Sequence, residues 1–498
     1  LRHRQFEQVG VFGRNFSIPD LETISNTANP TRNYDFSEQQ IRSFFGSASF
    51  TYRNYLFLTL TTRSDWSSTL PEDNNPFVYP SVSGSFVFTD AFDLPDALSY
   101  GKVRASWAEI GGDTDPYRTS LTYGIIGQHQ GQALETITQL SVPLLDLKPT
   151  STREIELGFE TQFFNDRFGV DFTWYRRSTV DQILDVTVSS ASGYTARTAN
   201  SGEIRNTGVE LLLTSIPFST ADWTWDSRVN FAANRSQVES LAPGLDVRVG
   251  PENRLATANI AQVVGQPANA IYGNTYVRDD QGRIVHGEDG LPLSGEKEVL
   301  GTGAPDWTLG FSNTISYQNV SLDFLIDAKW GGKVFSGTNA NAYGNGLHKA
   351  TLDARAACDE QAGSNGRYPE DCFVGEGVIG SVNSEGEVTV DRENDVGVRP
   401  SEYYGRISGE IAEEFVYDAN FIKLRQLRLS YDLPSSVMSR VPVRSASVSV
   451  VGRNLFYLYD SVPNISPESS YNSEATPGFE QAGVPQSRSI GASVNLRF

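Results

Sequence analysis

The chain has 498 residues and a net charge of −20, and 20% of its residues are charged. The negative charge argues against a nucleic-acid-binding protein, because such a protein needs a basic face to meet phosphates. No run of about 18 apolar residues is present, which excludes a helical membrane span but not transmembrane strands, whose apolar and polar residues alternate. Leu1–Phe6 contains neither an initiator Met nor an apolar signal segment, so we expect a processed chain or, in preference, a fragment.

Segments of alternating apolar and polar residues recur along the whole chain and predict β-strands, because successive strand side chains point to opposite faces. In 153–163, apolar residues share one face, while Glu154, Glu156 and Glu160 share the other. Many segments reach the length of a membrane-crossing strand, about nine residues or more, rather than the usual five or six. About fourteen strands are predicted, near residues 3–17, 41–53, 54–66, 79–89, 98–110, 153–163, 168–174, 204–217, 223–234, 307–317, 320–330, 419–432, 443–457 and 490–498.

The apolar faces of these strands predict a barrel wall with lipid outside and water inside. On this interpretation Glu154, Glu156 and Glu160 face the lumen, where they either pair with arginines of a plug or are simply solvated. The residues predicted to face lipid are Ile155, Leu157, Phe159, Phe172, Trp225, Phe231, Leu309, Phe311, Phe324 and Ile326.

Short and long connections alternate along the chain. Short turns at one rim and long loops at the other are typical of bacterial outer-membrane barrels. A soluble sandwich or propeller would have more even spacing, and no repeat of about 20 to 50 residues supports a propeller. Tight links lie at 52–54, 165–167 and 318–319, and long connections lie at 18–40, 111–151, 178–203, 239–305, 331–418 and 458–486.

Aromatic residues cluster at the ends of the predicted strands, where the rings of membrane proteins meet the lipid headgroups. The terminal strand, Ile490–Phe498, ends the chain on such a residue. Together with the alternation, the cluster favours an aromatic girdle over ordinary packing. Its members are Trp223, Trp225, Trp307, Tyr317, Trp330 and Phe498.

A series of motifs runs in order along nearly the whole chain: Ser47–Phe57, Arg63–Ser68, Tyr79–Ser83, Lys102–Trp107, Gly202–Leu211, Asn420–Arg425, Tyr431–Pro434, Gly452–Phe456 and the terminal Phe498. The series resembles that of SusC/RagA-type TonB-dependent outer-membrane transporters. The chain departs from the family's pattern at Trp66, Ile110–Asp113 and Asn464–Glu468. Because these changes affect turns and loops, they leave the identity of the substrate undetermined. They do not affect the predicted fold.

The resemblance implies an all-β fold in which residues 1–498 form the C-terminal portion, about fourteen strands, of a larger plugged transmembrane antiparallel β-barrel. The plug and the first barrel strands are not recognisable in this sequence. A protein of this family imports glycan oligomers or peptides across the outer membrane of a Gram-negative bacterium. TonB of the inner membrane energises it, a SusD-like surface lipoprotein caps it, and the family tends to pair two barrels with two lipoproteins. Phe498 resembles the signal that directs barrel insertion.

Cys358 and Cys372 are the only cysteines, and they flank a polar stretch that resembles an exposed loop. A disulfide between them would close a short loop and fit an oxidising compartment, whereas two free thiols are the alternative. Acidic residues of the same region, such as Asp371, Glu376 and Asp391, could bind calcium. Their spacing matches no calcium loop, so a calcium site is only an alternative.

No catalytic motif is present, so an enzyme is not predicted. The four histidines lie far apart, which predicts no zinc site, and no nucleotide-binding or nucleophile motif predicts a cofactor. Two other functions are compatible with the same sequence. One is a non-transporting outer-membrane surface or adhesion barrel, and the other is a secreted β-rich carbohydrate hydrolase.

Overall fold

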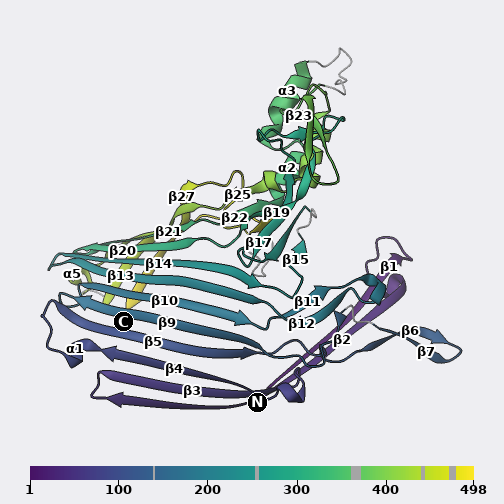
Figure 1. Ribbon diagram of the computed structural model, residues 1–498. Helices are drawn as coiled ribbons and strands as arrows, with labels where there is room; N and C mark the ends of the chain where they lie inside the picture. Colours follow the sequence, from purple (N-terminus) through teal and green to yellow (C-terminus); the bar gives the residue numbers. More distant parts are fainter. Residues whose placement is uncertain (138–140, 253–256, 361–371, 439–442, 470–477, 498) are drawn as a thin grey trace.

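The computed structural model describes residues 1–137, 141–252, 257–360, 372–438, 443–469 and 478–497. Its main element is one antiparallel sheet, and Figure 1 shows the long strands lying side by side. The predicted number and positions of the strands are confirmed. In spatial order the 14 strands are β1 (Arg2–Phe16), β2 (Thr27–Tyr52), β3 (Leu56–Ser67), β4 (Phe77–Val87), β5 (Leu98–Gly112), β9 (Thr150–Phe163), β10 (Phe168–Val180), β13 (Glu203–Ser219), β14 (Trp223–Ser240), β20 (Trp307–Tyr317), β21 (Val320–Trp330), β26 (Phe421–Asp432), β27 (Ser445–Asp460) and β29 (Ser489–Arg497).

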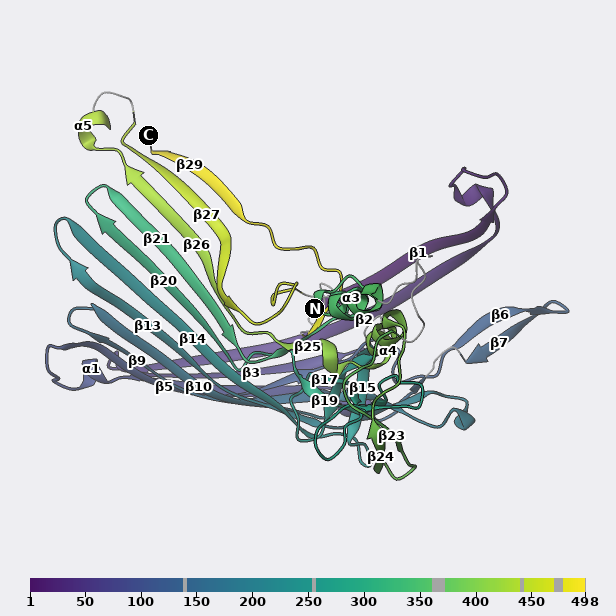
Figure 2. The same cartoon turned by 90° about the horizontal axis from the view of Figure 1, so that it is seen from above.

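The sheet is strongly curved and open, as the view from above shows (Figure 2). Strands β1 and β29 form its two edges, and among the described strands neither pairs with the other. The sheet is therefore a partial barrel. No helix among the described residues is long and apolar enough to span a membrane. Phe498, the predicted insertion signal, lies outside the described residues.

The connections divide into short turns at one rim and long segments at the other, as predicted. The turn between β9 and β10 holds Phe164, Asn165 and Asp166 at positive φ, a conformation that Asn and Asp tolerate well. One predicted loop, 18–40, is wrong in extent, because β2 already begins at Thr27. Residues 27–41 pair with β1 in a two-stranded ribbon whose side chains are mostly exposed. The sequence of this ribbon therefore lacks the alternation of apolar and polar residues that predicts a strand.

The strand register places the apolar positions on one face of the sheet. Phe159, Phe172, Leu211, Phe231 and Leu309 are successive partners on five neighbouring strands. The same register extends this face to the other residues predicted to face lipid. The alternation read from single strands is therefore continuous across the sheet, which is what a lipid-facing wall requires. We call this the apolar face and its opposite the polar face.

Two rows of aromatic rings border the apolar face. At the short-turn rim the rings of Trp223 and Tyr317 lie 4.5 Å apart, and at the long-loop rim those of Trp307 and Trp330 stack at 6.0 Å. Strand β20 carries Trp307 at one end and Tyr317 at the other. The ten steps between them span about 34 Å along the strand, or about 25 Å across a membrane at a barrel's usual tilt. This height matches the apolar band of outer-membrane barrels.

The described residues of the long connections 241–306 and 331–420 fold together into a separate body above the long-loop rim, which we call the loop domain (Figure 1). They were predicted as loops, but they bury a core of their own around Ile271, Phe335 and Phe415. The loop domain contains β15 (Val247–Glu252), β16 (Ala258–Val263), β17 (Ala270–Tyr276), β18 (Val285–His286), β19 (Ser294–Thr302), β22 (Lys333–Ser336), α2 (Gly337–Gly344), α3 (Leu352–Glu360), β23 (Val378–Val382), β24 (Val388–Glu393), α4 (Pro400–Glu410) and β25 (Val416–Asp418).

The remaining elements are small. Strand β28 joins β22 of the loop domain. The other elements lie at the two rims of the sheet. The predicted loop 178–203 contains the paired strands β11 and β12. Their bounds are α1 (Phe88–Ala91), β6 (Tyr123–His129), β7 (Gln132–Ile137), β8 (Ser141–Val142), β11 (Ile183–Thr187), β12 (Ala196–Asn200), α5 (Ser435–Met438) and β28 (Phe479–Glu480).

Candidate functional site

The three glutamates predicted to line the lumen lie on the polar face of β9. Arg177 on β10 binds the Glu154 carboxylate at 2.7 Å, and Lys102 on β5 binds that of Glu160 at 3.1 Å. Glu156 accepts a hydrogen bond from the Ser106 hydroxyl at 3.2 Å. Two of the three carboxylates therefore have cationic partners on neighbouring strands, and among the described residues Glu156 forms no ion pair.

Charged pairs of this kind recur along the polar face. Arg104 binds both Asp171 and Thr173, and Arg428 on β26 binds Asp323 on β21 at 2.9 Å. Each pair joins side chains of different strands, so opposite charges are balanced locally. The polar face is thus a hydrophilic wall on which many of the charges are paired across strands.

The described part of the segment between β27 and β29 contacts this wall mainly around one carboxylate, that of Glu468, and Ser466 and Gln486 add hydrogen bonds with Tyr457 and Lys423. Glu468 accepts a hydrogen bond from the Lys423 ammonium at 2.8 Å and also binds the Arg425 guanidinium, which in turn binds Asp327. The Tyr457 hydroxyl donates to Glu468 at 3.1 Å. Arg425 is the additional residue of a β-bulge, a feature that redirects a side chain from the regular strand pattern.

These contacts change the acidity of Glu468. Burial alone would raise the pKa of its carboxyl group, but the hydrogen bonds from Arg425 and Lys423 outweigh burial and hold the pKa at about 2. The group is therefore ionised at neutral pH and anchors the 461–469 segment to the wall. A cavity of 380 Å³ remains beside it, lined by Lys423, Tyr457 and Gln486 among others.

The sequence analysis did not predict this network. Asn420–Arg425 and Asn464–Glu468 were singled out as motifs, but nothing in their separation of about 40 residues shows that they meet. One signal for this network was present in the sequence, because both motifs are rich in polar residues. In the first motif these polar residues lie beside Leu424, which is on the apolar side of the same strand.

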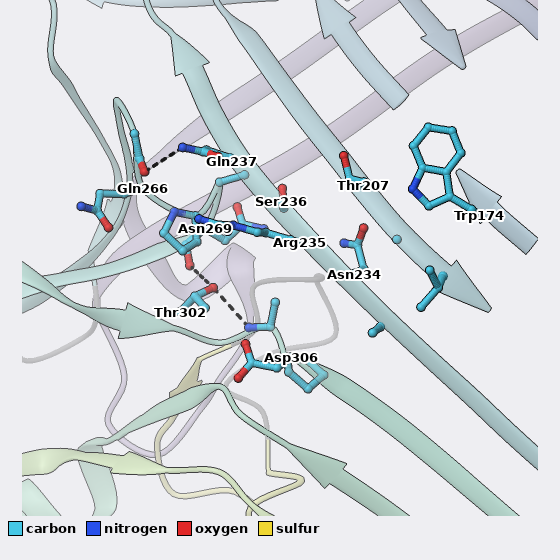
Figure 3. A pocket seen from close by; sticks show the side chains of 18 residues that line it. Trp174, Thr207, Asn234, Arg235, Ser236, Gln237, Gln266, Asn269, Thr302 and Asp306 are labelled. Atoms are coloured by element: carbon cyan, nitrogen blue, oxygen red, sulfur yellow. Dashed lines mark hydrogen bonds between the residues drawn. The ribbon is translucent and has the colours of Figure 1, made fainter. Parts of the chain in front are cut away.

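A cleft of 690 Å³ opens on the apolar side of the sheet at the long-loop rim (Figure 3). Trp174 and Arg235 line it from β10 and β14, and Gln266 and Asp306 line it from the connection that enters the loop domain. The Gln237 amide donates to the Gly265 carbonyl at 3.1 Å and so fixes one wall.

The loop domain carries a second concave surface. A cavity of 1240 Å³ is lined by Tyr343 and Tyr404 together with Asp353, Arg355 and Arg399. The Tyr343 hydroxyl is fixed by donation to a carboxylate oxygen of Glu414 at 2.9 Å. The aromatic rings and the charges of both signs suit a ligand with apolar and polar faces.

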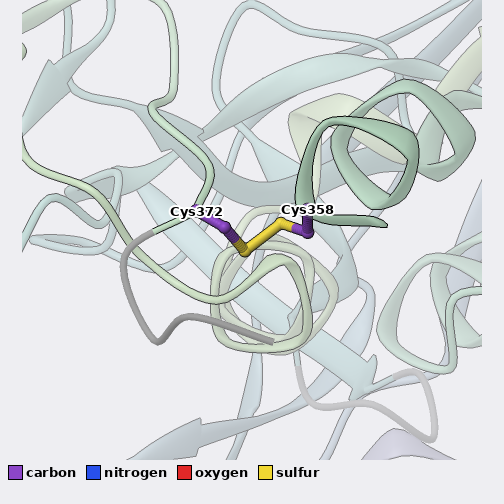
Figure 4. The surroundings of a disulfide bond; sticks show 2 residues. All are labelled: Cys358 and Cys372. Carbon is purple, nitrogen blue, oxygen red and sulfur yellow. A yellow bond between two sulfur atoms is a disulfide. The ribbon is translucent and has the colours of Figure 1, made fainter. Parts of the chain in front are cut away.

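Cys358 and Cys372 lie beside this cavity and form a disulfide with an S–S distance of 2.02 Å (Figure 4). Cys358 belongs to α3, and both cysteines are buried inside the loop domain, so the expectation of an exposed position is wrong for these two residues. Residues 361–371, including Asp371, lie outside the described residues. Among the described residues no group of acidic, His or Cys side chains is arranged to hold a metal ion.

The sequence model of the family described as "TonB dependent receptor-like, beta-barrel" matches residues 1–361. Among curated proteins, TonB-dependent receptor P26 of Formosa agariphila is 27% identical over 98% of this chain and 49% of its own length. TonB-dependent receptor SusC of Bacteroides thetaiotaomicron is 26% identical over 71% of this chain and 38% of its own. The chain thus spans about half the length of the first of these relatives, and less of the second.

Among solved structures, the RagAB peptide importer in its open-open state matches 100% of this chain and 52% of the solved chain. Its TM-score is 0.71 at 20% sequence identity. At this identity the match concerns the fold, and it agrees with the large antiparallel sheet described above.

Proposed function

Because this chain belongs to the TonB dependent receptor-like β-barrel family of the outer membrane, we propose that it forms part of an active importer. The importer is of the SusC/RagA type. It takes up glycan oligomers or peptides, is energised through TonB, and is capped by a SusD-like lipoprotein.

The observation that carries this proposal is the difference between the two faces of the sheet. An apolar face about 25 Å high, bordered by aromatic rings, suits lipid, and the opposite face carries paired charges that suit a hydrated passage. A passage this wide leaks unless a plug closes it, and a plugged barrel requires energy from the inner membrane to open. Glu156 is the wall carboxylate available to a plug arginine.

The loop domain supports the proposal that a lipoprotein caps the importer. It is a folded body with its own core at the long-loop rim, so it offers a partner a preformed surface rather than separate flexible loops. Its aromatic cavity, with Tyr404, Arg355 and Asp353, suits either a sugar stacked on a ring or a zwitterionic peptide.

Uptake measured in cells tests the proposal. The protein is produced from its whole reading frame in an outer-membrane host, and uptake of fluorescent oligosaccharides and oligopeptides is followed with and without a functional TonB. We expect TonB-dependent uptake of one of the two classes. The same cells provide the test of the cap, because affinity purification of the tagged protein should recover a surface lipoprotein in equal amounts.

Uptake that is absent for both classes, in cells whose outer membrane contains the folded protein, would contradict the importer and favour the adhesion barrel. Tyr404→Ala in the loop-domain cavity is the sharpest variant. Loss of uptake with unchanged membrane abundance would assign the cavity to substrate. Tyr117→Ala, an exposed tyrosine outside the loop domain, is the matched control.

A further inference from the structure

We propose that the last long connection of the chain is a strap that couples the polar face of the sheet to the cavity of the loop domain. The strap consists of the described residues of that connection, 461–469 and 478–488. The inference concerns the control of the cavity, so it goes beyond the proposed function. It does not require the cavity to bind a substrate, because its test follows a helix that lines the cavity.

The first part of the strap, 461–469, contacts both the polar face and the loop domain. Its Glu468 carboxylate binds the Lys423 ammonium of β26 at 2.8 Å. Four residues earlier, the Asn464 amide donates to the side-chain oxygen of Asn339 in α2 at 3.1 Å. The Asn339 amide donates in turn to the backbone carbonyl just before Asn464, also at 3.1 Å. Asn339 is 1% exposed, so this reciprocal contact is buried.

The second part of the strap also contacts both bodies. Gln486 accepts a hydrogen bond from the Lys423 ammonium on the polar face. Phe479 of β28 pairs with Phe335 of β22 and lies in the core of the loop domain, where the two rings are 5.9 Å apart. Figure 2 shows the chain before β29 reaching the loop domain. Each part of the strap therefore bridges the polar face and the loop domain by itself.

Glu480 joins the strap to the beginning of α2. Its carboxylate accepts hydrogen bonds from the Ser336 hydroxyl at 2.9 Å and from the Thr338 hydroxyl at 2.6 Å. Ser336 is the N-cap of α2, and Thr338 lies in its first turn. A negative charge at this end of a helix is favoured by the helix dipole. Because Glu480 is only 2% exposed, displacement of the strap would remove a buried partner that water does not replace.

Helix α2 links these contacts to the cavity. Tyr343, near its end, lines the cavity of 1240 Å³, and its ring packs against that of Tyr404 at 5.6 Å. The helix has only 8 residues and contains glycine and asparagine, so it has little stability of its own. Its stability must come from packing and from the strap. Loss of the ionic contacts at the polar face should therefore loosen α2 and with it the Tyr343 side of the cavity.

The test is amide hydrogen exchange of the full-length protein and its variants, folded in detergent micelles. Glu468→Gln removes the anion through which the strap binds the polar face. Arg428→Gln on the same strand is the matched control, because Arg428 pairs with Asp323 and has no ion pair with the described part of the strap. We expect exchange of 337–344 to rise about fivefold or more in Glu468→Gln, and to stay within about twofold of wild type in the control. Exchange of β23, whose backbone pairs with β18 and β24, should not rise.

A variant at the other end tests whether the effect passes through the strap. Thr338→Val keeps the shape of the side chain but removes the hydroxyl that binds Glu480, so it should also raise exchange of 337–344. In the double variant E468Q/T338V the two fold-changes should not multiply, because a strap that is already displaced has no further contact to lose. Fold-changes that multiply would overturn the proposal. Unchanged exchange of α2 in Glu468→Gln, or an equal rise in β23, would overturn it as well.

A milder variant keeps the test decisive if Glu468→Gln does not fold. Tyr457→Phe retains the ring but removes the hydroxyl that donates to Glu468 at 3.1 Å. It should raise exchange of 337–344 by about twofold or more, and unchanged exchange there would count against the strap. Uptake of substrate is measured separately, so a failure here leaves the importer proposal untouched.

Discussion

The Glu468 carboxylate and the Lys423 ammonium meet at 2.8 Å, and this contact joins the last long connection of the chain to the polar wall of the sheet. Lys423 is almost completely buried, with 2% of its side chain exposed, and Glu468 is 12% exposed. A buried ammonium requires a partner, because the cost of removing it from water is large and only a close anion offsets it. The wall and the 461–469 segment are therefore one structural unit.

Neutralising Glu468 should release this segment. Glu468→Gln keeps the shape of the side chain but leaves Lys423 and Arg425 without a shared anion, and breaking such a buried pair costs about 3 to 5 kcal/mol. Hydrogen–deuterium exchange of 461–469 should rise sharply in the variant while β20 and β21 stay protected. Glu385→Gln, at an exposed position, is the control. Unchanged exchange in 461–469 would show that the anchor is elsewhere.

Acid should have the same effect on the unaltered protein. The pKa of Glu468 is lowered in the folded state to about 2, below its ordinary value of 4.5, so the folded state binds this proton less readily than the unfolded state. The stabilising contribution is fully present above about pH 4.5 and is lost as the pH falls from there towards 2. Proteolytic cleavage within 461–469 by an acid-active protease should therefore accelerate below pH 4.5, and Glu468→Gln should abolish that dependence.

Placing a charge on the apolar face should be far more costly than placing one on the polar face. Phe159 packs against Phe172, with ring centroids 5.5 Å apart, whereas Glu156 lies on the opposite face of the same strand. Phe159→Arg should destabilise the barrel in lipid by about 2 to 4 kcal/mol, and Glu156→Arg should be tolerated. Urea unfolding in liposomes, followed by tryptophan fluorescence, measures both. Equal damage at the two positions would contradict the assignment of the faces.

The disulfide should stabilise the loop domain and leave the sheet unaffected. Its two cysteines are 14 positions apart, which gives a ring of 15 residues counted inclusively, and the chain-entropy model assigns such a ring at most about 3 kcal/mol. Non-reducing peptide mapping of protein from the cell envelope should recover the linked peptides. Cys358→Ser should lower protease resistance in the loop domain while heat-resistant migration of the barrel is retained. Two free thiols in the envelope protein would refute the bond.

The chain terminus should control insertion. Strand β29 lies at an edge of the sheet and pairs only with β27 among the described strands, so its free side needs a partner strand in the membrane. Deleting Phe498 from the full-length protein should lower its abundance in the outer membrane without changing substrate choice in the molecules that do insert. Quantitative blotting of membrane fractions with parallel uptake measures the two effects. Normal abundance of the shortened protein would remove the role of Phe498.

Much of the fold is readable from the sequence because the alternation of apolar and polar residues is a local property. Residues 153–163 contain enough information to separate Phe159 from Glu156, and the register of the sheet bears out the separation. The family predicted from the motifs is confirmed as well. The alternation of apolar and polar residues did not predict the strand at Thr27–Gln40, because this ribbon lies outside the apolar band and needs no apolar face. It also carried no information on the core of the loop domain.

The tertiary structure alone decided which residues act together. Lys423 and Glu468 are 45 positions apart, and no local pattern shows that they meet. The contact arises because strand register and chain folding bring distant segments together, and a shift of β26 by one residue would move Lys423 to the other face of the sheet. The sequence by itself thus determined strands, faces and family, whereas strand register and the folding of the long connections decided which residues anchor the 461–469 segment to the wall.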